Sequence, residues 1–265
     1  MTSLDDIYLT RWGHAGPTVV LVHGSAQGSR VGGDRHFAAQ QVLASEGWQL
    51  VVPDRPGHGR SPAPGRPDDA EADGAWVADL LGDDLPGGGA HLVGHSFGGC
   101  VALAAAARRP GAVRSLTLIE PGMQKLAIDD PRVRRFVLKL AGTMIFSFTA
   151  KRRAAGMARL LGIPGDIRGG SNPEELKAMG RGIAKLKVPA AATLQRELET
   201  VKRAGIPLLV VTGGWSPAFD VVGERVAAIG GGRHEIVASP NHFPNLMPAF
   251  NPMLTAFMRA ADARA

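Results

Sequence analysis

The sequence predicts an α/β fold with a mostly parallel sheet flanked by helices. Two patterns carry this prediction: short apolar runs rich in β-branched residues recur along the chain, and stretches with helical spacing separate them. Strands that alternate with helices form crossover units, which build parallel sheets. The length of 265 residues allows one α/β domain with a sizeable core and an insertion.

The predicted strands are continuous apolar segments, as expected for strands that helices cover on both faces. In chain order they are Thr18 to Val22, Gln49 to Val52, His91 to Val93, Arg114 to Ile119, Ile206 to Thr212 and Arg233 to Val237. Helical patterns follow the third and fifth strands, at Val101 to Ala107 and at Val221 to Ile229. Ligands bind beyond the carboxyl ends of such strands, so functional residues are expected there.

The third strand runs into residues 94–98, Gly-His-Ser-Phe-Gly, and the alanine-rich helix follows. A G-x-S-x-G sequence between a strand and a helix predicts a sharp turn that strains Ser96, with glycines permitting the close approach. The helix dipole would favour negative charge near the Ser96 hydroxyl. Because the chain has 35 glycines, a glycine-rich turn with a capping serine explains the pentapeptide alone equally well.

Two other strand-end loops give the pentapeptide a context. His23-Gly24-Ser25 follows the first strand, and residues 54–61, Asp-Arg-Pro-Gly-His-Gly-Arg-Ser, follow the second. In this order and spacing the three segments resemble the α/β-hydrolase superfamily, and the resemblance covers nearly the whole chain. It implies a core of residues 1–121 and 206–265, a helical cap inserted at residues 122–205, and a nucleophilic Ser96.

The predicted cap has sequence support of its own, because about 80 residues are too many for a plain connection. Its helical segments are Pro131 to Phe148, Ala150 to Leu161, Pro173 to Lys187 and Ala190 to Ala204. Several apolar side chains there fit either an apolar pocket or simple packing of cap on core. They are Met144, Phe146, Phe148, Met157, Leu160, Leu161 and Met179.

A serine needs a base to remove its proton, and the resemblance assigns this role to His242. His242 lies in the loop after the last strand and follows the nucleophile in chain order. The alternative is a histidine that merely caps the C-terminal helix. Of the other histidines, His95 is expected to point away from the nucleophile, and His23 and His58 to hold backbone.

The triad acid departs from the superfamily pattern, because Ser216 stands where most members have a carboxylate. Two carboxylates could replace it. Asp220 lies further along the same loop, where a role as helix N-cap also explains it. Glu120 ends the strand Leu116 to Ile119 and is fixed by Pro121, as in superfamily members that place the acid there. Glu120 is the favoured assignment.

These residues predict acyl transfer to water through an acyl-enzyme on Ser96, with an ester, thioester or lactone as the substrate. The resemblance places the oxyanion donors at the backbone N–H groups of Phe97 and Ser25. The same triad also suits C–C bond hydrolysis or cofactor-free perhydrolysis. From another class, a receptor-like protein with a degenerate site remains open because of Ser216.

The net charge of +6 is unevenly distributed. From Met123 to Gly205 there are 17 Lys and Arg against 7 Asp and Glu, while the rest carries 13 against 17. Solvated helix faces explain this segment best, although a membrane surface, an acidic partner protein or steering of an anionic substrate also fits. Without a nucleic-acid motif, no nucleic-acid partner is expected.

The remaining expectations concern cofactors, location and assembly. No metal-ligand cluster or nucleotide fingerprint appears in the sequence, so no cofactor is expected. The sequence contains no run of about 18 apolar residues, so no membrane span is predicted. The single Cys100, expected to be a buried structural thiol, and the absence of a secretory start predict a cytoplasmic protein. A small-molecule substrate is expected, and a homodimer is left open.

Overall fold

The computed structural model describes residues 6–24, 26–82, 85, 88–163 and 172–264. Its described residues form a seven-stranded sheet in the order β1-β3-β2-β4-β5-β6-β7. The strands are β1 (Leu9–Trp12), β2 (Thr18–Val22), β3 (Gln49–Pro53), β4 (Ala90–His95), β5 (Val113–Ile119), β6 (Leu208–Thr212) and β7 (Arg233–Ile236). Only β1 pairs antiparallel, so the prediction of a mostly parallel sheet is confirmed.

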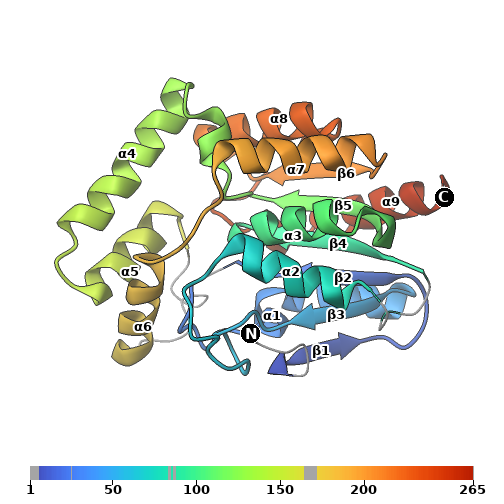
Figure 1. Ribbon diagram of the computed structural model, residues 1–265, viewed down its shortest axis with the longest axis horizontal. Coiled ribbons are helices and arrows are strands. Elements are labelled where there is room, and N and C mark those ends of the chain that lie inside the picture. The colour runs from blue at the N-terminus through green and yellow to red at the C-terminus, as the bar shows by residue number, and fades with distance from the viewer. Residues whose placement is uncertain (1–5, 25, 83–84, 86–87, 164–171, 265) are drawn as a thin grey trace.

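The helical elements connect the strands and cover both faces of the sheet (Figure 1). The α-helices are α1 (Gly33–His36), α2 (Ala70–Leu80), α3 (Phe97–Arg108), α4 (Pro131–Phe146), α5 (Ala150–Leu160), α6 (Pro173–Ile183), α7 (Ala191–Arg203), α8 (Pro217–Gly230) and α9 (Phe250–Asp262). The 3-10 segments are η2 (Ala38–Glu46), η3 (Pro110–Ala112), η4 (Gln124–Ala127) and η5 (Pro244–Leu246).

Alternate residues of the central strands β2 to β6 pack into two separate cores. In β2, Val20 and Val22 pack into a cluster with side chains of α2, α3, α7 and α8. Their neighbours Val19 and Leu21 pack on the opposite face with η2 and α9. Successive side chains of a strand point to opposite faces, so a fully apolar strand fills both cores. This explains why the parallel strands read as continuous apolar runs.

The segment between β5 and β6 is helical, and its helices have two different surroundings. The helices α4, α5 and α6, called the inserted helices below, lie together beyond one end of the sheet (Figure 1). Only the first half of α4 reaches the core, through Val133 and Phe136, whereas α7 packs against both α3 and α8 and contributes Leu194, Leu198 and Val201. The domain boundaries predicted at residues 122 and 205 stay a prediction, although α7 lies within the flanking layer of the sheet.

One edge strand has no counterpart in the predicted set. The strand β1 is short, only partly buried, and pairs antiparallel with β3 through Leu9 opposite Pro53 to Trp12 opposite Leu50. A four-residue half-buried edge strand lacks the continuous apolar run that identifies a central strand. Among the described residues, no helix combines the length and the apolar character needed to cross a bilayer.

Candidate active site

The turn between β4 and α3 holds Ser96 in a strained backbone conformation, with φ 56° and ψ −121°. The glycines on either side permit this turn. A Cβ atom on Gly98 would lie 2.3 Å from the carbonyl oxygen of Val22, and one on Gly94 would lie 2.4 Å from the carbonyl oxygen of Gly98. Side chains at either position would therefore push strand and helix apart, and with them the serine.

The loops after β5 and β7 bring Glu120 and His242 together. Nδ1 of His242 lies 3.2 Å from Oε2 of Glu120, and the backbone N–H of Gly213 donates to Oε1 at 2.6 Å. Both side chains are buried. Glu120 also has a positive φ of 46°, a conformation that costs a non-glycine residue free energy. The surrounding contacts hold this carboxylate against the ring that the sequence predicts as the base.

Asp220, the alternative acid, has other partners. Its Oδ1 accepts a hydrogen bond of 2.6 Å from the hydroxyl of Thr212, which lies 2.8 Å from Nε2 of His234. The predicted N-cap role of Asp220 is wrong, because α8 begins at Pro217 with Ser216 as its N-cap residue. Proline at the first helical position starts the helix four residues earlier than the apolar pattern indicates.

Two further histidines fix the backbone and orientation of the predicted base. Nε2 of His95 lies 2.7 Å from the carbonyl oxygen of His242, and Nδ1 of His95 lies 2.9 Å from Nε2 of His36. A carbonyl can only accept, so His95 carries its proton on Nε2 and its Nδ1 accepts from His36. Burial lowers the pKa of both rings, which keeps them neutral and preserves this donor order.

The ring of His95, which the sequence predicts to point away from the nucleophile, donates to the carbonyl oxygen of His242. His95 and His36 both line the cavity that contains Ser96. The sequence predicts neither the bond from His95 to His242 nor the bond from His36 to His95. The position of His95 directly before Ser96 was a usable sequence signal, because its ring must lie close to the turn that holds the serine. For His36, on a short helix 59 positions upstream, no sequence signal connects the two rings.

A buried charge network supports the loop after β2. The guanidinium of Arg55 binds the carboxylates of Asp68 and Asp73 and reaches the carbonyl oxygen of Gly24 at 3.4 Å. The backbone N–H of Arg55 donates to Nε2 of His23, so the Nδ1–H of His23 donates to the Gly24 carbonyl oxygen at 2.7 Å. Arg55 and His23 therefore hold this loop, and His23 binds backbone as the sequence predicts.

Of the two predicted oxyanion donors, the structure describes Phe97 but not Ser25. Phe97 is the first residue of α3, and the first N–H groups of a helix have no partner within it. Ser25 lies outside the described residues. Its neighbour Gly24 approaches the elbow so closely that a Cβ there would lie 2.8 Å from Cβ of Ser96. The backbone after β2 thus reaches the serine, as an oxyanion loop requires.

Burial governs the protonation of the Glu120–His242 pair. It lowers the pKa of His242 to about 3 and raises the pKa of Glu120 to about 8, against the opposing hydrogen bond from Gly213. The carboxyl group of Glu120 and the imidazole of His242 are hydrogen-bonded and titrate together, so the pair keeps one extra proton until the pH approaches 8. Among the residues described, His242 Nε2 is buried with no hydrogen-bond partner.

Burial also raises the pKa of Cys100 to about 12, so this thiol is protonated.

A cavity of about 370 Å³ lies between these loops and the inserted helices. Its core side includes His36, His95, Ser96 and His242. Its other side is apolar and includes Met157, Leu161, Ile163, Leu176, Met179 and Ile183. The cavity is the size of a small-molecule site, with few polar groups on one side. Of the apolar side chains considered from sequence, those that do not line the cavity are Met144, Phe146, Phe148 and Leu160. Phe146 and Phe148 are 73% and 84% exposed.

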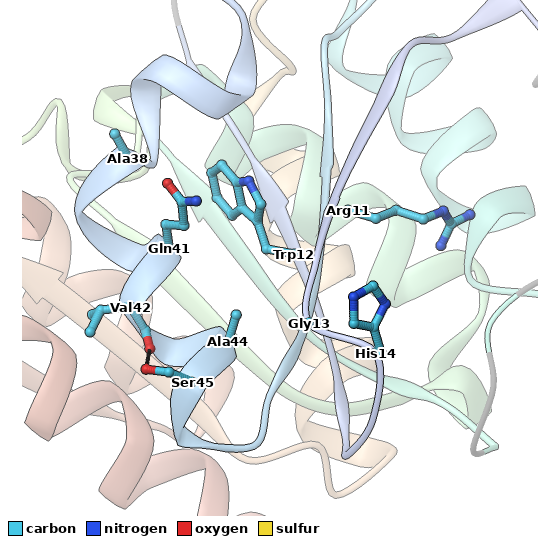
Figure 2. A pocket seen from close by; sticks show the side chains of 9 residues that line it. All are labelled: Arg11, Trp12, Gly13, His14, Ala38, Gln41, Val42, Ala44 and Ser45. Atoms are coloured by element: carbon cyan, nitrogen blue, oxygen red, sulfur yellow. Dashed lines mark hydrogen bonds between the residues drawn. The ribbon is translucent and has the colours of Figure 1, made fainter.

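A second concavity, of about 640 Å³, lies between η2 and the end of β1 (Figure 2). It does not bring chemical groups together. Figure 2 shows the side chains of Arg11 and His14 pointing away from those of η2. The hydroxyl of Ser45 donates to the carbonyl oxygen of Val42 at 2.7 Å. The cavity at Ser96 is therefore the better candidate for a reaction site.

Comparisons with known proteins agree with this geometry. A family model described as alpha/beta hydrolase fold matches residues 17–165. Lipase LipV of Mycobacterium tuberculosis is 35% identical over 56% of this chain and 53% of its own. A pimeloyl-[acyl-carrier protein] methyl ester esterase of Neisseria meningitidis is 30% identical over 74% of this chain and 61% of its own. The chain thus spans about half to three-fifths of the length of these relatives.

Solved structures show the same fold over nearly the whole chain. Est816, titled an N-acyl homoserine lactone degrading enzyme, superposes with a TM-score of 0.68 at 21% identity, covering 95% of this chain and 96% of its own. The esterase EaEST of Exiguobacterium antarcticum also gives 0.68, at 18% identity over 96% and 95% of the two chains. The predicted resemblance is confirmed, and the chain belongs to the α/β-hydrolase family.

Proposed function

We propose that the protein is a serine hydrolase that cleaves a small to medium, apolar ester, thioester or lactone through an acyl-enzyme on Ser96. The observation that carries the proposal is the convergence of Ser96 and His242 on one cavity, with Glu120 bound to the far side of the His242 ring. Nucleophile, base and orienting acid in this order form the functional unit of serine hydrolases.

The proposed reaction uses each of these groups once in acylation and once in deacylation. Nε2 of His242 takes the hydroxyl proton while Oγ of Ser96 attacks the carbonyl carbon. The same proton then passes to the leaving alcohol or thiol as the acyl-enzyme forms. Glu120 orients the ring through Nδ1 and stabilises the transient imidazolium. Water, deprotonated by His242, releases the acid and restores Ser96.

The wall of the cavity supports an acyl group as the bound part of the substrate. Met157, Leu161 and Met179 contribute apolar surface opposite Ser96, whereas the polar atoms lie on the core side. A cavity of about 370 Å³ suits a small to medium molecule. The names of the relatives point the same way, since they include a lipase, a methyl ester esterase and a lactone-degrading enzyme.

Two measurements test the proposal. A fluorophosphonate probe should label the wild-type protein and leave Ser96→Ala unlabelled, because the probe reacts only with an activated serine. A panel of p-nitrophenyl esters of increasing acyl length, with a lactone added, should show turnover that peaks at a chain length set by the cavity.

The control for folding is thermal unfolding of Ser96→Ala, which removes a single partly buried hydroxyl. Tight binding of an apolar ligand without labelling would assign the fold to a receptor-like protein and contradict the proposal. Labelling without turnover of any ester or lactone would move the reaction to C–C hydrolysis or perhydrolysis by the same triad.

A further inference from the structure

The end of α4 and the turn into α5 expose large apolar side chains to solvent. Leu138, Ile145, Phe146 and Phe148 are 65%, 69%, 73% and 84% exposed. Counted over the described residues, they are half of the eight large apolar side chains that stay exposed. Single exposed apolar residues are ordinary, but a contiguous group marks an interaction surface.

Helical spacing places these side chains next to positive charges. Residues three, four and seven apart lie on one face of a helix. Leu138 and Ile145 share such a face, and Arg135, Lys139 and Phe146 share the face beside it. All five are exposed. The outer surface of α4 is therefore apolar and basic at once.

The charge of this region has one sign. From Pro131 to Leu161 the sequence contains eight Lys and Arg and no Asp or Glu. The cations Lys139, Lys151 and Arg152 are exposed around the apolar group. Within the described part of the chain, none of these three has a carboxylate at salt-bridge distance, in contrast to Arg132, which pairs with Asp130. The three charges are available to an external anion.

We propose that this surface docks the protein on a lipid membrane that carries anionic headgroups. The surface, called the α4–α5 tip, consists of Arg135, Leu138, Lys139, Ile145, Phe146, Phe148, Lys151 and Arg152. Its apolar side chains would enter the boundary between headgroups and acyl chains, while the cations bind phosphates. The tip lies at the edge of the molecule farthest from the sheet, where no other element stands in front of it (Figure 1).

A second copy of the chain fits this surface less well. A two-fold interface would bring each patch against its own copy, so the basic residues would meet one another. The segment from 131 to 161 holds no carboxylate to neutralise them. An acidic protein would supply charge, but it would also need a groove to receive Ile145, Phe146 and Phe148. A membrane supplies both anionic charge and an adaptable apolar layer.

The tip is continuous with the wall of the cavity. The helix α5 begins at Ala150, two residues after Phe148, and its Met157 lines the cavity with Leu161, the residue that follows the helix. Docking would hold this wall near the membrane, from which apolar acyl substrates could enter. This last step rests on the proposed function, whereas the docking itself does not.

Sedimentation with vesicles tests the docking. The protein should sediment with vesicles of phosphatidylcholine and phosphatidylglycerol, stay in solution with phosphatidylcholine alone, and lose affinity as salt rises. Replacing Lys139, Lys151 and Arg152 by Gln should weaken binding by about fivefold for each charge, or about a hundredfold together. Phe146→Ser with Phe148→Ser should also reduce binding, with the remaining binding more sensitive to salt.

Matched variants control for net charge and for apolar area. Arg108→Gln, Lys185→Gln and Arg259→Gln together remove three exposed charges elsewhere, and Ile236→Ser removes an apolar side chain that is 57% exposed. These variants should bind as the wild type does. All variants should keep the melting temperature and the turnover of a water-soluble ester, which separates failed docking from failed catalysis.

Three outcomes would overturn the docking proposal. They are equal binding to both kinds of vesicle, equal losses in tip and control variants, and absence of vesicle binding. In the last case, a concentration-dependent dimer that Phe146→Ser with Phe148→Ser dissolves would assign the tip to a second copy of the chain.

Discussion

The two sides of the cavity use polar groups in opposite ways. The core side buries titratable groups and binds each to a partner, as with Glu120 and His242 or Arg55 with Asp68 and Asp73. The inserted helices turn apolar side chains toward the cavity and place most of their charges in solvent, as with the exposed pair Lys177 and Glu174, while Glu175 is buried. The chemistry proposed here therefore belongs to the core, and selection of the substrate to the inserted helices.

This difference predicts where substitutions act. Changes on the core side should alter turnover or folding strongly, because a buried charge or donor left without its partner is costly. Changes on the inserted helices should mainly alter which substrate is accepted, because their contacts with it are apolar and their charges are screened.

The largest expected effect separates the two candidate acids. Glu120→Gln should reduce kcat by about ten-thousandfold, because an amide at this position favours the wrong tautomer of His242. Asp220→Asn should keep most of the activity, since Asp220 binds Thr212 instead. Steady-state kinetics on the best ester measures both, with circular dichroism to verify folding. Loss of activity in Asp220→Asn alone would reverse the assignment.

The next effect concerns folding of the core. Arg55→Met should lower the free energy of unfolding by about 3–5 kcal/mol, because the buried Asp68 would lose its guanidinium partner and the buried Asp73 would keep only the partly exposed Arg66. Urea unfolding monitored by fluorescence gives the value. The matched control on the inserted helices is Lys177→Met, which breaks an exposed pair and should not change the unfolding midpoint measurably. Equal destabilisation by the two variants would contradict the comparison.

The pH dependence of the reaction should report the buried pair. The active form needs Glu120 ionised and His242 neutral with its proton on Nδ1. Because burial raises the pKa of Glu120 to about 8, lowering the pH below this value adds a proton to the pair and removes active enzyme. From pH 6 to pH 8, kcat/KM should rise by about fiftyfold. A profile that is flat over this range would show that the carboxylate is already ionised.

The smallest expected effect lies in the apolar wall. Met179→Trp should shorten the cavity and reduce kcat/KM for the longest accepted acyl chain by about tenfold relative to a short one. Leu138→Trp, on the exposed face of α4, is the matched control and should leave the ratio unchanged. The ester panel measures both variants. An unchanged preference in Met179→Trp would place the acyl group elsewhere in the cavity.

The core could be predicted closely because its signals are local and repeated. The strand Thr18–Val22 has the predicted bounds, and the other central strands differ by one to three residues. Glu120 could be predicted as the candidate acid because it follows an apolar strand and precedes a proline. The contact between His36 and His95 was not, since it depends on how the loops after β2 and β4 meet in space.

The inserted helices were predictable as helices, but their surroundings were not. Spacing identifies the apolar faces of α4 and α5, yet it does not say what covers each face. Met157 therefore faces the cavity whereas Phe146 faces solvent, although both looked equally suited to a pocket. Likewise, α7 reads as another helix of the insertion and instead packs on α3 and α8.

The backbone of His242 is held from both sides of the cavity. Its carbonyl oxygen accepts from Nε2 of His95, and its N–H donates to the carbonyl oxygen of Leu161 at 3.3 Å. An acyl group that presses α5 outward would stretch the second bond and shift the ring relative to Ser96. An oversized substrate would then bind and still react slowly, so that discrimination by size appears in kcat as well as in KM.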